Sequence, residues 1–167
     1  MKLKTITACL IILALGVYGT YKLTKRHYLA HSGYDILLHS KTINGKDVSS
    51  LIDKDKPLLV NFWGSWCPDC VGELAEIEKL SKNKNLTLIT VAQNSGSNEK
   101  IKEFMKKKGV DFIVVNDKDN KIVNAYRIFI YPTTYYYSPS RNKTVLKRAG
   151  SLKYEEYLFF TDFVNKY

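Results

Sequence analysis

Two of the three cysteines in this 167-residue chain, Cys67 and Cys70, are separated by only two residues. They lie in the segment NFWGSWCPDC, at the end of a run of large apolar residues. Two thiols at this spacing can form a reversible disulfide, or they can supply half of a four-ligand metal site. Residues elsewhere in the chain distinguish between a redox disulfide and a metal site.

The metal alternative lacks further ligands. A structural zinc site usually takes four, and the chain has no second cysteine pair. Its three histidines precede the first firmly predicted strand, and none stands at ligand spacing with another histidine or a cysteine: His27, His31 and His39. We therefore expect no bound metal and no cofactor beyond the disulfide. A copper site built from the cysteine pair and a distant histidine stays open as an alternative.

The residues after Cys67 predict a helix over 67–82. An apolar stripe recurs there every three or four residues, at Val71, Leu74, Ile77 and Leu80. Pro68 falls at the first helical position, where its missing N–H costs nothing, so Cys67 becomes the N-cap. Free backbone N–H groups and the helix dipole favour a thiolate there, and can lower a cysteine pKa from about 8.5 to roughly 3.5–7.5. We expect Cys67 to be the attacking sulfur and Cys70, nearly one turn further in, to be the resolving thiol.

Short β-rich runs alternate with helical ones after Tyr34. The expected strands cover residues 58–63, 86–91, 112–115, 134–137 and 144–148, the last two joined as a hairpin. The expected helices cover residues 67–82, 98–108, 120–127 and 153–165. This order predicts an α/β domain over residues 34–167, with a mixed central sheet covered by helices on both faces.

The N-terminus predicts a membrane anchor. Residues 5–21 carry no charge, and as a helix at roughly 1.5 Å per residue they would span about 25 Å. We expect a short cytoplasmic tail over residues 1–4, an uncleaved transmembrane helix over 5–21 and a linker over 22–33. A cleaved signal peptide is the rival interpretation, but no good cleavage site follows the apolar run.

The formal net charge of +10 is unevenly distributed. Residues 1–30 hold five of the 26 Lys and Arg residues and no acid, which leaves 21 basic against 16 acidic residues for the rest. The excess in the domain is therefore about half of the total and is scattered over predicted helix ends and loops. We expect a solvated surface and no nucleic-acid partner.

The cysteine motif has a companion further along the chain. WGSWCPDC follows a predicted strand, and about 60 residues later the chain reads Ile130-Tyr131-Pro132-Thr133-Thr134. Together they resemble the thioredoxin superfamily, and more narrowly its membrane-anchored TlpA/ResA/DsbE-like branch of bacterial thiol-disulfide oxidoreductases. The similarity covers residues 34–167, and the segment KTINGK before the first core strand is also typical of that branch.

This resemblance implies a substrate site around the sulfurs. Pro132 matches the proline that follows a cis peptide bond in this fold. The Tyr131 backbone would lie beside the sulfurs and, with Thr133, bind an extended peptide. Trp66 matches the aromatic residue that shields the disulfide and contacts substrate, whereas Trp63 is expected in the core. The branch usually has glycine where Ile130 stands, so we expect a narrower or more aromatic groove.

Glu73 is the candidate proton acceptor for Cys70. Ordinary thioredoxins carry a buried acid at the position of Asn61, which cannot titrate. Glu73 stands three residues after Cys70, hence one turn away on the same helix face, and it matches an acid of the ResA-like branch. The alternative is a surface glutamate like Glu76.

Asp69, one of the two residues between the cysteines, indicates the direction of electron transfer. The negative charge of Asp69 raises the energy of a nearby thiolate, which makes the disulfide more stable and the dithiol a stronger reductant. We expect a potential nearer to about −270 mV than to the roughly −120 mV of a strong oxidant.

The expected function is that of an extracytoplasmic disulfide reductant acting on protein disulfides through Cys67 and Cys70. A membrane electron donor would renew the dithiol. We expect the domain in the periplasm or outside the cell, anchored to the bacterial cytoplasmic membrane. The alternatives are a copper-binding or copper-stress protein and a peroxiredoxin-like peroxidase, although Gly64 stands where such a peroxidase needs Thr or Ser.

Overall fold

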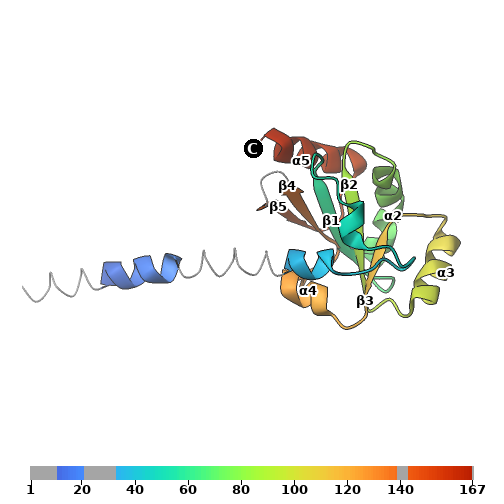
Figure 1. The fold of residues 1–167 in the computed structure, drawn as a ribbon, viewed down its shortest axis with the longest axis horizontal. Coiled ribbons are helices and arrows are strands. Elements are labelled where there is room, and N and C mark those ends of the chain that lie inside the picture. Colours follow the sequence, from blue (N-terminus) through green and yellow to red (C-terminus); the bar gives the residue numbers. More distant parts are fainter. Residues whose placement is uncertain (1–10, 21–32, 139–142, 167) are drawn as a thin grey trace, which may run out of the picture.

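The computed structural model describes residues 11–20, 33–138 and 143–166. Within them, five strands form one mixed sheet in the order β3-β2-β1-β4-β5 (Figure 1). The strands are β1 (Leu58–Trp63), β2 (Thr87–Gln93), β3 (Val114–Asp117), β4 (Thr133–Ser138) and β5 (Lys143–Ala149). The first three are parallel to one another, whereas β4 runs antiparallel to both β1 and β5.

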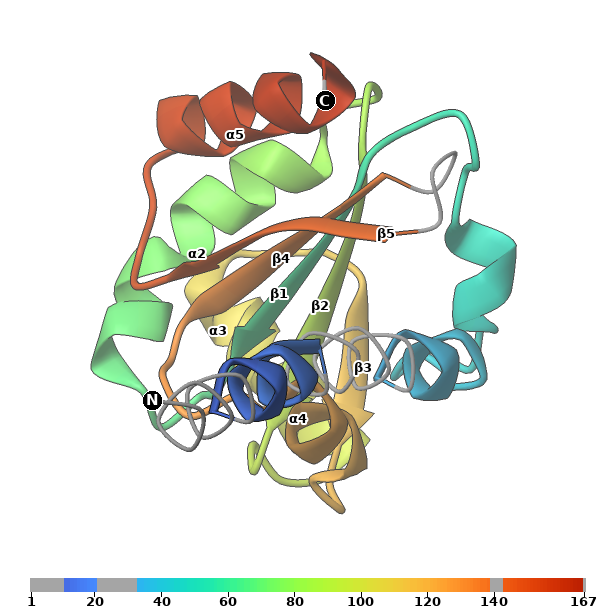
Figure 2. The same cartoon turned by 90° about the vertical axis from the view of Figure 1, so that its left-hand side faces the viewer.

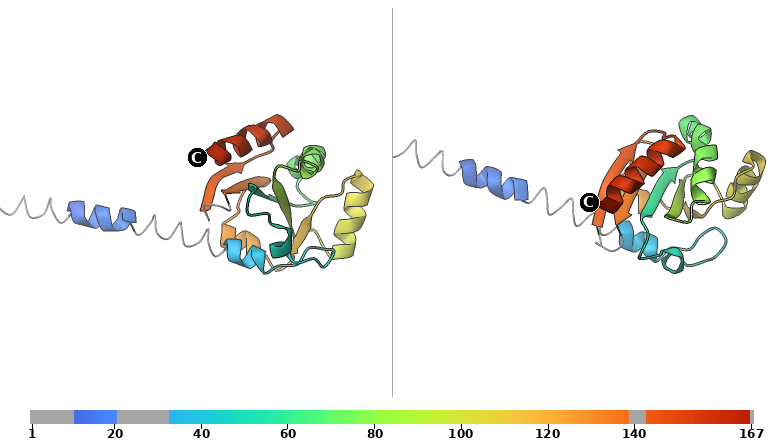
Figure 3. Two further views of the ribbon diagram at one scale, coloured as in Figure 1. Left: turned by 45° about the horizontal axis from the view of Figure 1, so that its top comes forward. Right: turned by 90° about the horizontal axis from the view of Figure 1, so that it is seen from above.

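Helices connect and cover the strands. They are α2 (Pro68–Ser81), α3 (Asn98–Lys108), α4 (Lys121–Tyr126) and α5 (Tyr154–Lys166), with a 3-10 turn, η1 (Val48–Leu51), and short helices over residues 11–20 and 33–38. Figure 2 shows α2 and α5 running side by side over the sheet, with α4 at the other side. The views from other directions in Figure 3 agree, with α3 next to α2.

The central strand β1 supplies both halves of the core. Its six side chains are all buried. Leu59 and Trp63 pack with side chains of α2, α3 and α5, whereas Val60 and Phe62 pack with those of α4 and the helix over 33–38. Asn61 lies between Leu59 and Trp63 in the alternation, so it faces α2 and α5.

The tyrosines of β4 follow the same alternation. Tyr135 and Tyr137 belong to the core half that includes α4, and Tyr136 belongs to the half that includes α2 and α5. The alternation of side chains along β4 therefore divides these neighbouring tyrosines between the two faces of the sheet.

Most expected boundaries hold within two residues. The bounds of β1 and α3 are those expected, and α2 starts at Pro68 with Cys67 as its N-cap. The strand β3 begins at Val114, two residues later than expected, because pairing with β2 starts opposite Thr90. Phe112 still packs in the core, against Trp63 with ring centroids 6.1 Å apart, but from irregular backbone.

The segment KTINGK forms a tight turn beside the sheet. Thr42 bridges to Val115 of β3, and Ile43 donates a 2.8 Å backbone hydrogen bond to Val114. Gly45 has a φ of 81°, a left-handed conformation that glycine adopts without strain.

Only part of the expected membrane anchor is described. Residues 11–20 are helical with exposed apolar side chains, among them Ile12 and Val17. No helix within the described residues is both long and apolar enough to span a bilayer. Residues 5–10 and 21 of the anchor, and the linker up to residue 32 with His27 and His31, lie outside the described residues.

Candidate active site

Cys67 and Cys70 are joined by a disulfide at the N-terminus of α2. Their Cα atoms lie 5.3 Å apart, and both side chains are buried, with 5% and 1% of their surface exposed. The site stands just after the C-terminal end of β1, so the central strand delivers the cysteines to the carboxyl edge of the parallel part of the sheet.

The backbone around Cys67 has N-cap geometry. Cys67 is extended while Pro68 begins the helix, and Cys67 Sγ accepts a 3.2 Å hydrogen bond from the N–H of Cys70. In the reduced protein, a sulfur at this position would be stabilised as a thiolate by the helix dipole and this N–H. The local geometry that the sequence predicts for the attacking sulfur is therefore present.

Trp66 stands immediately before Cys67 in the chain and is partly exposed. Its side chain is 53% exposed, and its Nε1 donates a 3.0 Å hydrogen bond to the carbonyl of Gln93 at the end of β2. The indole stands edge-on to the ring of Tyr131, with centroids 5.4 Å apart. Trp63 is 2% exposed and lies in the core, as the sequence predicts, whereas the shielding and substrate-binding role of Trp66 stays a prediction.

The segment before β4 completes this side of the site. The peptide bond between Tyr131 and Pro132 is cis. The Pro132 carbonyl accepts a 2.8 Å hydrogen bond from Gly150, and the Thr133 hydroxyl donates a 2.7 Å bond to the carbonyl of Ile130. Thr133 is 1% exposed, so its side chain holds the loop, and the roles of these residues toward substrate stay predictions.

Glu73 lies in the interior and not on the surface of α2. It is 3% exposed, and its Oε1 accepts two 2.6 Å hydrogen bonds, from the backbone N–H of Leu152 and from the hydroxyl of Tyr157. Asn61 Nδ2 donates to the Tyr157 hydroxyl at 3.3 Å and to Thr134 at 3.0 Å. A buried polar network thus links β1, β4, α5 and the helix that carries both cysteines.

Burial raises the pKa of Glu73 above its ordinary value, and the nearby Glu76 carboxylate acts in the same direction. The hydrogen bonds from Tyr157, Leu152 and Asn61 oppose this shift without cancelling it. The pKa of Tyr157 is also raised, by burial first and then by Glu73, so its hydroxyl stays protonated and acts as donor. A carboxyl group whose pKa is raised, one turn from Cys70, holds a proton more tightly than an exposed glutamate and can act as an acid or a base there.

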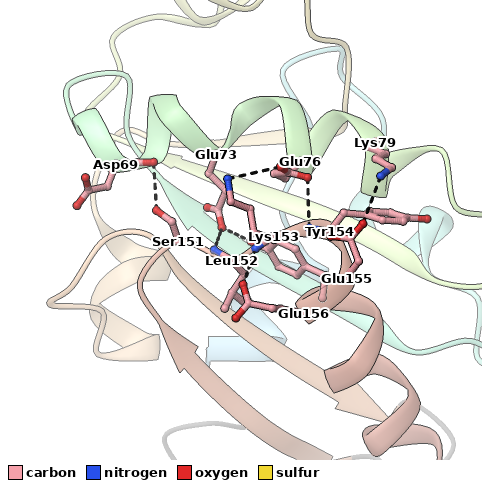
Figure 4. Close-up of polar contacts among 11 residues, drawn as sticks. Asp69, Glu73, Glu76, Lys79, Ser151, Leu152, Lys153, Tyr154, Glu155 and Glu156 are labelled. Carbon is pink, nitrogen blue, oxygen red and sulfur yellow. Dashed lines mark hydrogen bonds and ion pairs between the residues drawn. The ribbon is translucent and has the colours of Figure 1, made fainter.

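The loop between β5 and α5 is fastened to α2 along its length (Figure 4). Ser151 donates to the Asp69 carbonyl at 3.2 Å, and the N–H of Tyr154 donates to Glu76 at 3.2 Å. Glu73 points into this junction, where Leu152 meets it. The loop therefore encloses the Glu73 carboxylate.

Two exposed apolar residues stand next to the site, of which the sequence assigned Ile130 an effect on the width of the groove and Phe129 no role. Phe129 is 85% exposed and Ile130 is 60% exposed, immediately before Tyr131. The signal was present as a run of apolar residues, Ile128 to Tyr131, with no strand or helix period to account for it.

Tyr157 lies within the helix expected over residues 153–165, and the sequence assigns it no role in the site. The structure shows Tyr157 fully buried, with its hydroxyl bonded to Glu73 in the core. The identity of that partner depends on α5 packing against α2, and the sequence alone does not give this contact.

The described residues contain no group of three His, Cys, Asp or Glu side chains that could hold a metal ion. His39 is exposed, and its Nδ1 contacts the carbonyl of Asp35 at 2.8 Å. The cysteines therefore have no neighbouring ligand set among the residues that the structure covers.

Comparison with known proteins gives one family and several relatives. Residues 35–154 match the model of the AhpC/TSA family. Thiol-disulfide oxidoreductase ResA of Bacillus subtilis is 36% identical over 111 residues, which cover 65% of this chain and 62% of that protein. The thioredoxin-like protein YneN of the same organism is 38% identical over 100 residues, covering 57% of this chain and 58% of YneN. The chain thus spans about three fifths of the length of these relatives.

Among solved structures, StoA from Bacillus subtilis superposes with a TM-score of 0.62 at 26% identity, covering 73% of this chain and 93% of StoA. The fold is therefore thioredoxin-like, with a mixed sheet between helices, as the sequence predicts.

Proposed function

This chain belongs to the AhpC/TSA family, and we propose that it is a thiol-disulfide oxidoreductase that reduces protein disulfides through Cys67 and Cys70. The observation that carries the proposal is a disulfide between the N-cap and the first turn of α2, beside the partly exposed Trp66. The similarity to ResA, itself a thiol-disulfide oxidoreductase, supports it.

The first step is nucleophilic. The Cys67 thiolate attacks one sulfur of a substrate disulfide, forms a mixed disulfide and releases the other substrate sulfur as a thiolate. The substrate would lie extended along Trp66 and Tyr131, with Pro132 and Thr133 behind them. The aromatic contact between Trp66 and Tyr131 supports this location.

The second step regenerates the disulfide present in the structure. Cys70 gives its proton to Glu73, and its thiolate attacks Cys67 Sγ, which expels the second substrate thiolate. Two electrons pass from the dithiol to the substrate, and the Cys67–Cys70 disulfide forms. The burial of Glu73 one turn from Cys70, with a raised pKa, supports its role as the proton acceptor.

We further propose that the domain works outside the cytoplasm, anchored by residues 5–21 and re-reduced by a membrane electron donor. The exposed apolar side chains of the helix over 11–20 support an anchor. A reducing dithiol in an oxidising compartment needs such a donor, because its thiols would otherwise stay oxidised.

The test is a trapping experiment in cells that express the full chain. Cys70→Ser should accumulate a mixed disulfide through Cys67, whereas Cys67→Ser should accumulate none. The reduction potential, measured against glutathione, should lie below about −180 mV. A higher potential would reverse the direction of transfer, and stoichiometric copper uptake without trapping would favour the copper-binding alternative.

The peroxidase alternative is disfavoured at one position. A peroxiredoxin-like site needs Thr or Ser three residues before the cysteine, where Gly64 stands. A Cβ at Gly64 would lie 2.5 Å from Trp66 Nε1, so such a residue requires the indole to move. We expect negligible peroxide turnover.

A further inference from the structure

We propose that Tyr157 is a positioning residue for the exchange reaction, and that its hydroxyl, held by Asn61, orients the Glu73 carboxylate and sets its proton affinity. The inference rests on the proposed function, because it assigns a partner to the group that handles the proton of Cys70. Neither the motif around the cysteines nor the one around Pro132 contains this residue.

With Glu73 ionised, the donor and acceptor roles in the network have one consistent assignment, in which the Thr134 hydroxyl, 3.4 Å from that of Tyr157, is a donor to Tyr157. The Glu73 carboxylate is acceptor-only when ionised, so the 2.6 Å contact to Tyr157 requires the tyrosine hydroxyl to donate its proton. Asn61 Nδ2 donates to the same hydroxyl at 3.3 Å and occupies one of its lone pairs. The hydroxyl hydrogen is therefore directed at Glu73.

Asn61 is itself held in place. It sits in β1 directly opposite Thr134 of β4 and donates to the Thr134 hydroxyl at 3.0 Å. Asn61, Thr134 and Tyr157 are all buried, so water does not compete for the hydrogen bonds of the network. The sheet therefore fixes the orientation of a hydroxyl that α5 carries to the helix of the cysteines.

Other charged groups near Glu73 do not perform this role. Glu76 on α2 acts by repulsion and is turned to the N–H of Tyr154. Lys153 reaches Glu76, with 3.9 Å between Nζ and Oε1. Tyr136 of β4 senses the charge of Glu73, but its hydroxyl has no hydrogen-bond partner in the structure.

The two groups that donate to Glu73 Oε1, the N–H of Leu152 and the hydroxyl of Tyr157, differ in kind. Leu152 donates through its backbone N–H, which side-chain substitutions other than proline leave in place, whereas Tyr157→Phe removes the Tyr157 hydroxyl alone. Hydrogen bonds to a buried carboxylate favour its ionised form. Without the hydroxyl, Glu73 should bind its proton more tightly, and Cys70 should give up its own proton only at higher pH.

The experiment compares Tyr157→Phe with Tyr136→Phe. Both tyrosines are fully buried on the same side of the sheet, but only Tyr157 contacts Glu73, so Tyr136→Phe is a matched control. The Glu73 pKa is measured from the carboxyl ¹³C shift of the oxidised protein, which needs no activity. The rate of release of the second substrate thiol is measured against pH in single turnover.

Tyr157→Phe should increase the proton affinity of Glu73 by about tenfold. The acidic limb of the rate profile should then move to higher pH by about one unit. Tyr136→Phe should change neither quantity. In the wild-type protein, the ring ¹³Cζ signal of Tyr157 should inflect at the pH where Glu73 titrates, a result that does not depend on how a variant folds.

Equal Glu73 titration in the two variants, or a shifted titration without a shifted rate profile, would overturn the inference. The same holds if the wild-type Tyr157 signal ignores the titration of Glu73. If the wild-type protein exchanged no disulfides, the proposed function would fail, and the titrations would still decide whether Tyr157 controls Glu73.

Discussion

The backbone N–H of Leu152 donates a 2.6 Å hydrogen bond to Glu73 Oε1, across 79 residues of sequence. This contact joins the loop before α5 to the helix that carries the cysteines. It explains how a carboxyl group that is 3% exposed is tolerated in the core. Burying the same group without hydrogen-bond donors would cost more folding free energy than burying it with them.

The stability of the oxidised protein should depend on the charge of Glu73. Its pKa is raised in the folded state, so the folded protein binds this proton more tightly than the unfolded chain. The resulting stabilisation is complete below the unfolded-state pKa and is lost as pH rises through the folded-state pKa. The Glu73→Gln variant has no group that ionises at this position, so its free energy of unfolding does not decrease for this reason as pH rises.

The free energy of unfolding of Glu73→Gln, minus that of the wild-type protein, should therefore increase as pH rises from the unfolded-state pKa of Glu73 to its higher folded-state pKa. Denaturant titrations at several pH values measure the difference, and Glu76→Gln serves as the control on the same helix. A difference that stayed flat or decreased would contradict the raised pKa.

Asp69 should make the reduction potential more negative. It is exposed in the first turn of α2, next to the cap position of Cys67. Replacing it with lysine reverses a charge that interacts with the thiolate by about 1–2 kcal/mol, which corresponds to about 20–40 mV in the oxidising direction. Asp69→Asn should give about half of this change, as measured by equilibrium with glutathione. A lower potential for Asp69→Lys would reject the electrostatic explanation.

The two tryptophans should respond differently to removal. Trp63 packs against Phe104 and Phe112, so Trp63→Ala should lower the free energy of unfolding by about 3–5 kcal/mol. Trp66→Ala should lower it by less than about 1 kcal/mol, because half of the side chain is exposed. Trp66→Ala should instead raise the KM for a peptide disulfide. Similar losses of stability in both variants would argue against this division.

Phe129 should contact the substrate. It is 85% exposed and precedes Tyr131 by two residues. Burying part of a phenylalanine is worth about 1–2 kcal/mol, so Phe129→Ala should raise the KM for an apolar peptide disulfide by about five- to thirtyfold. Phe159→Ala is the control, since Phe159 is also exposed but belongs to α5. Equal KM values for the two variants would exclude a binding role for Phe129.

The sequence by itself determined the local part of this site. Cys67, Pro68 and the stripe that ends at Leu80 specify a helix start with a sulfur at its cap, because capping and helical period depend on residues within one or two turns. The alternation of apolar runs likewise predicted the mixed sheet and its helices, with strand ends displaced by two residues at β3.

Only the tertiary structure decided what surrounds Glu73. Its burial, its bond to Leu152 and the hydroxyl of Tyr157 depend on α5 and its preceding loop packing against α2, as does the link to Asn61 through β1. These contacts join residues 79 to 96 positions apart, and no local period encodes which buried polar groups meet across such distances. The position of the reactive sulfur thus depends on a short stretch of sequence. The environment of the proton acceptor Glu73 depends on the packing of the whole domain.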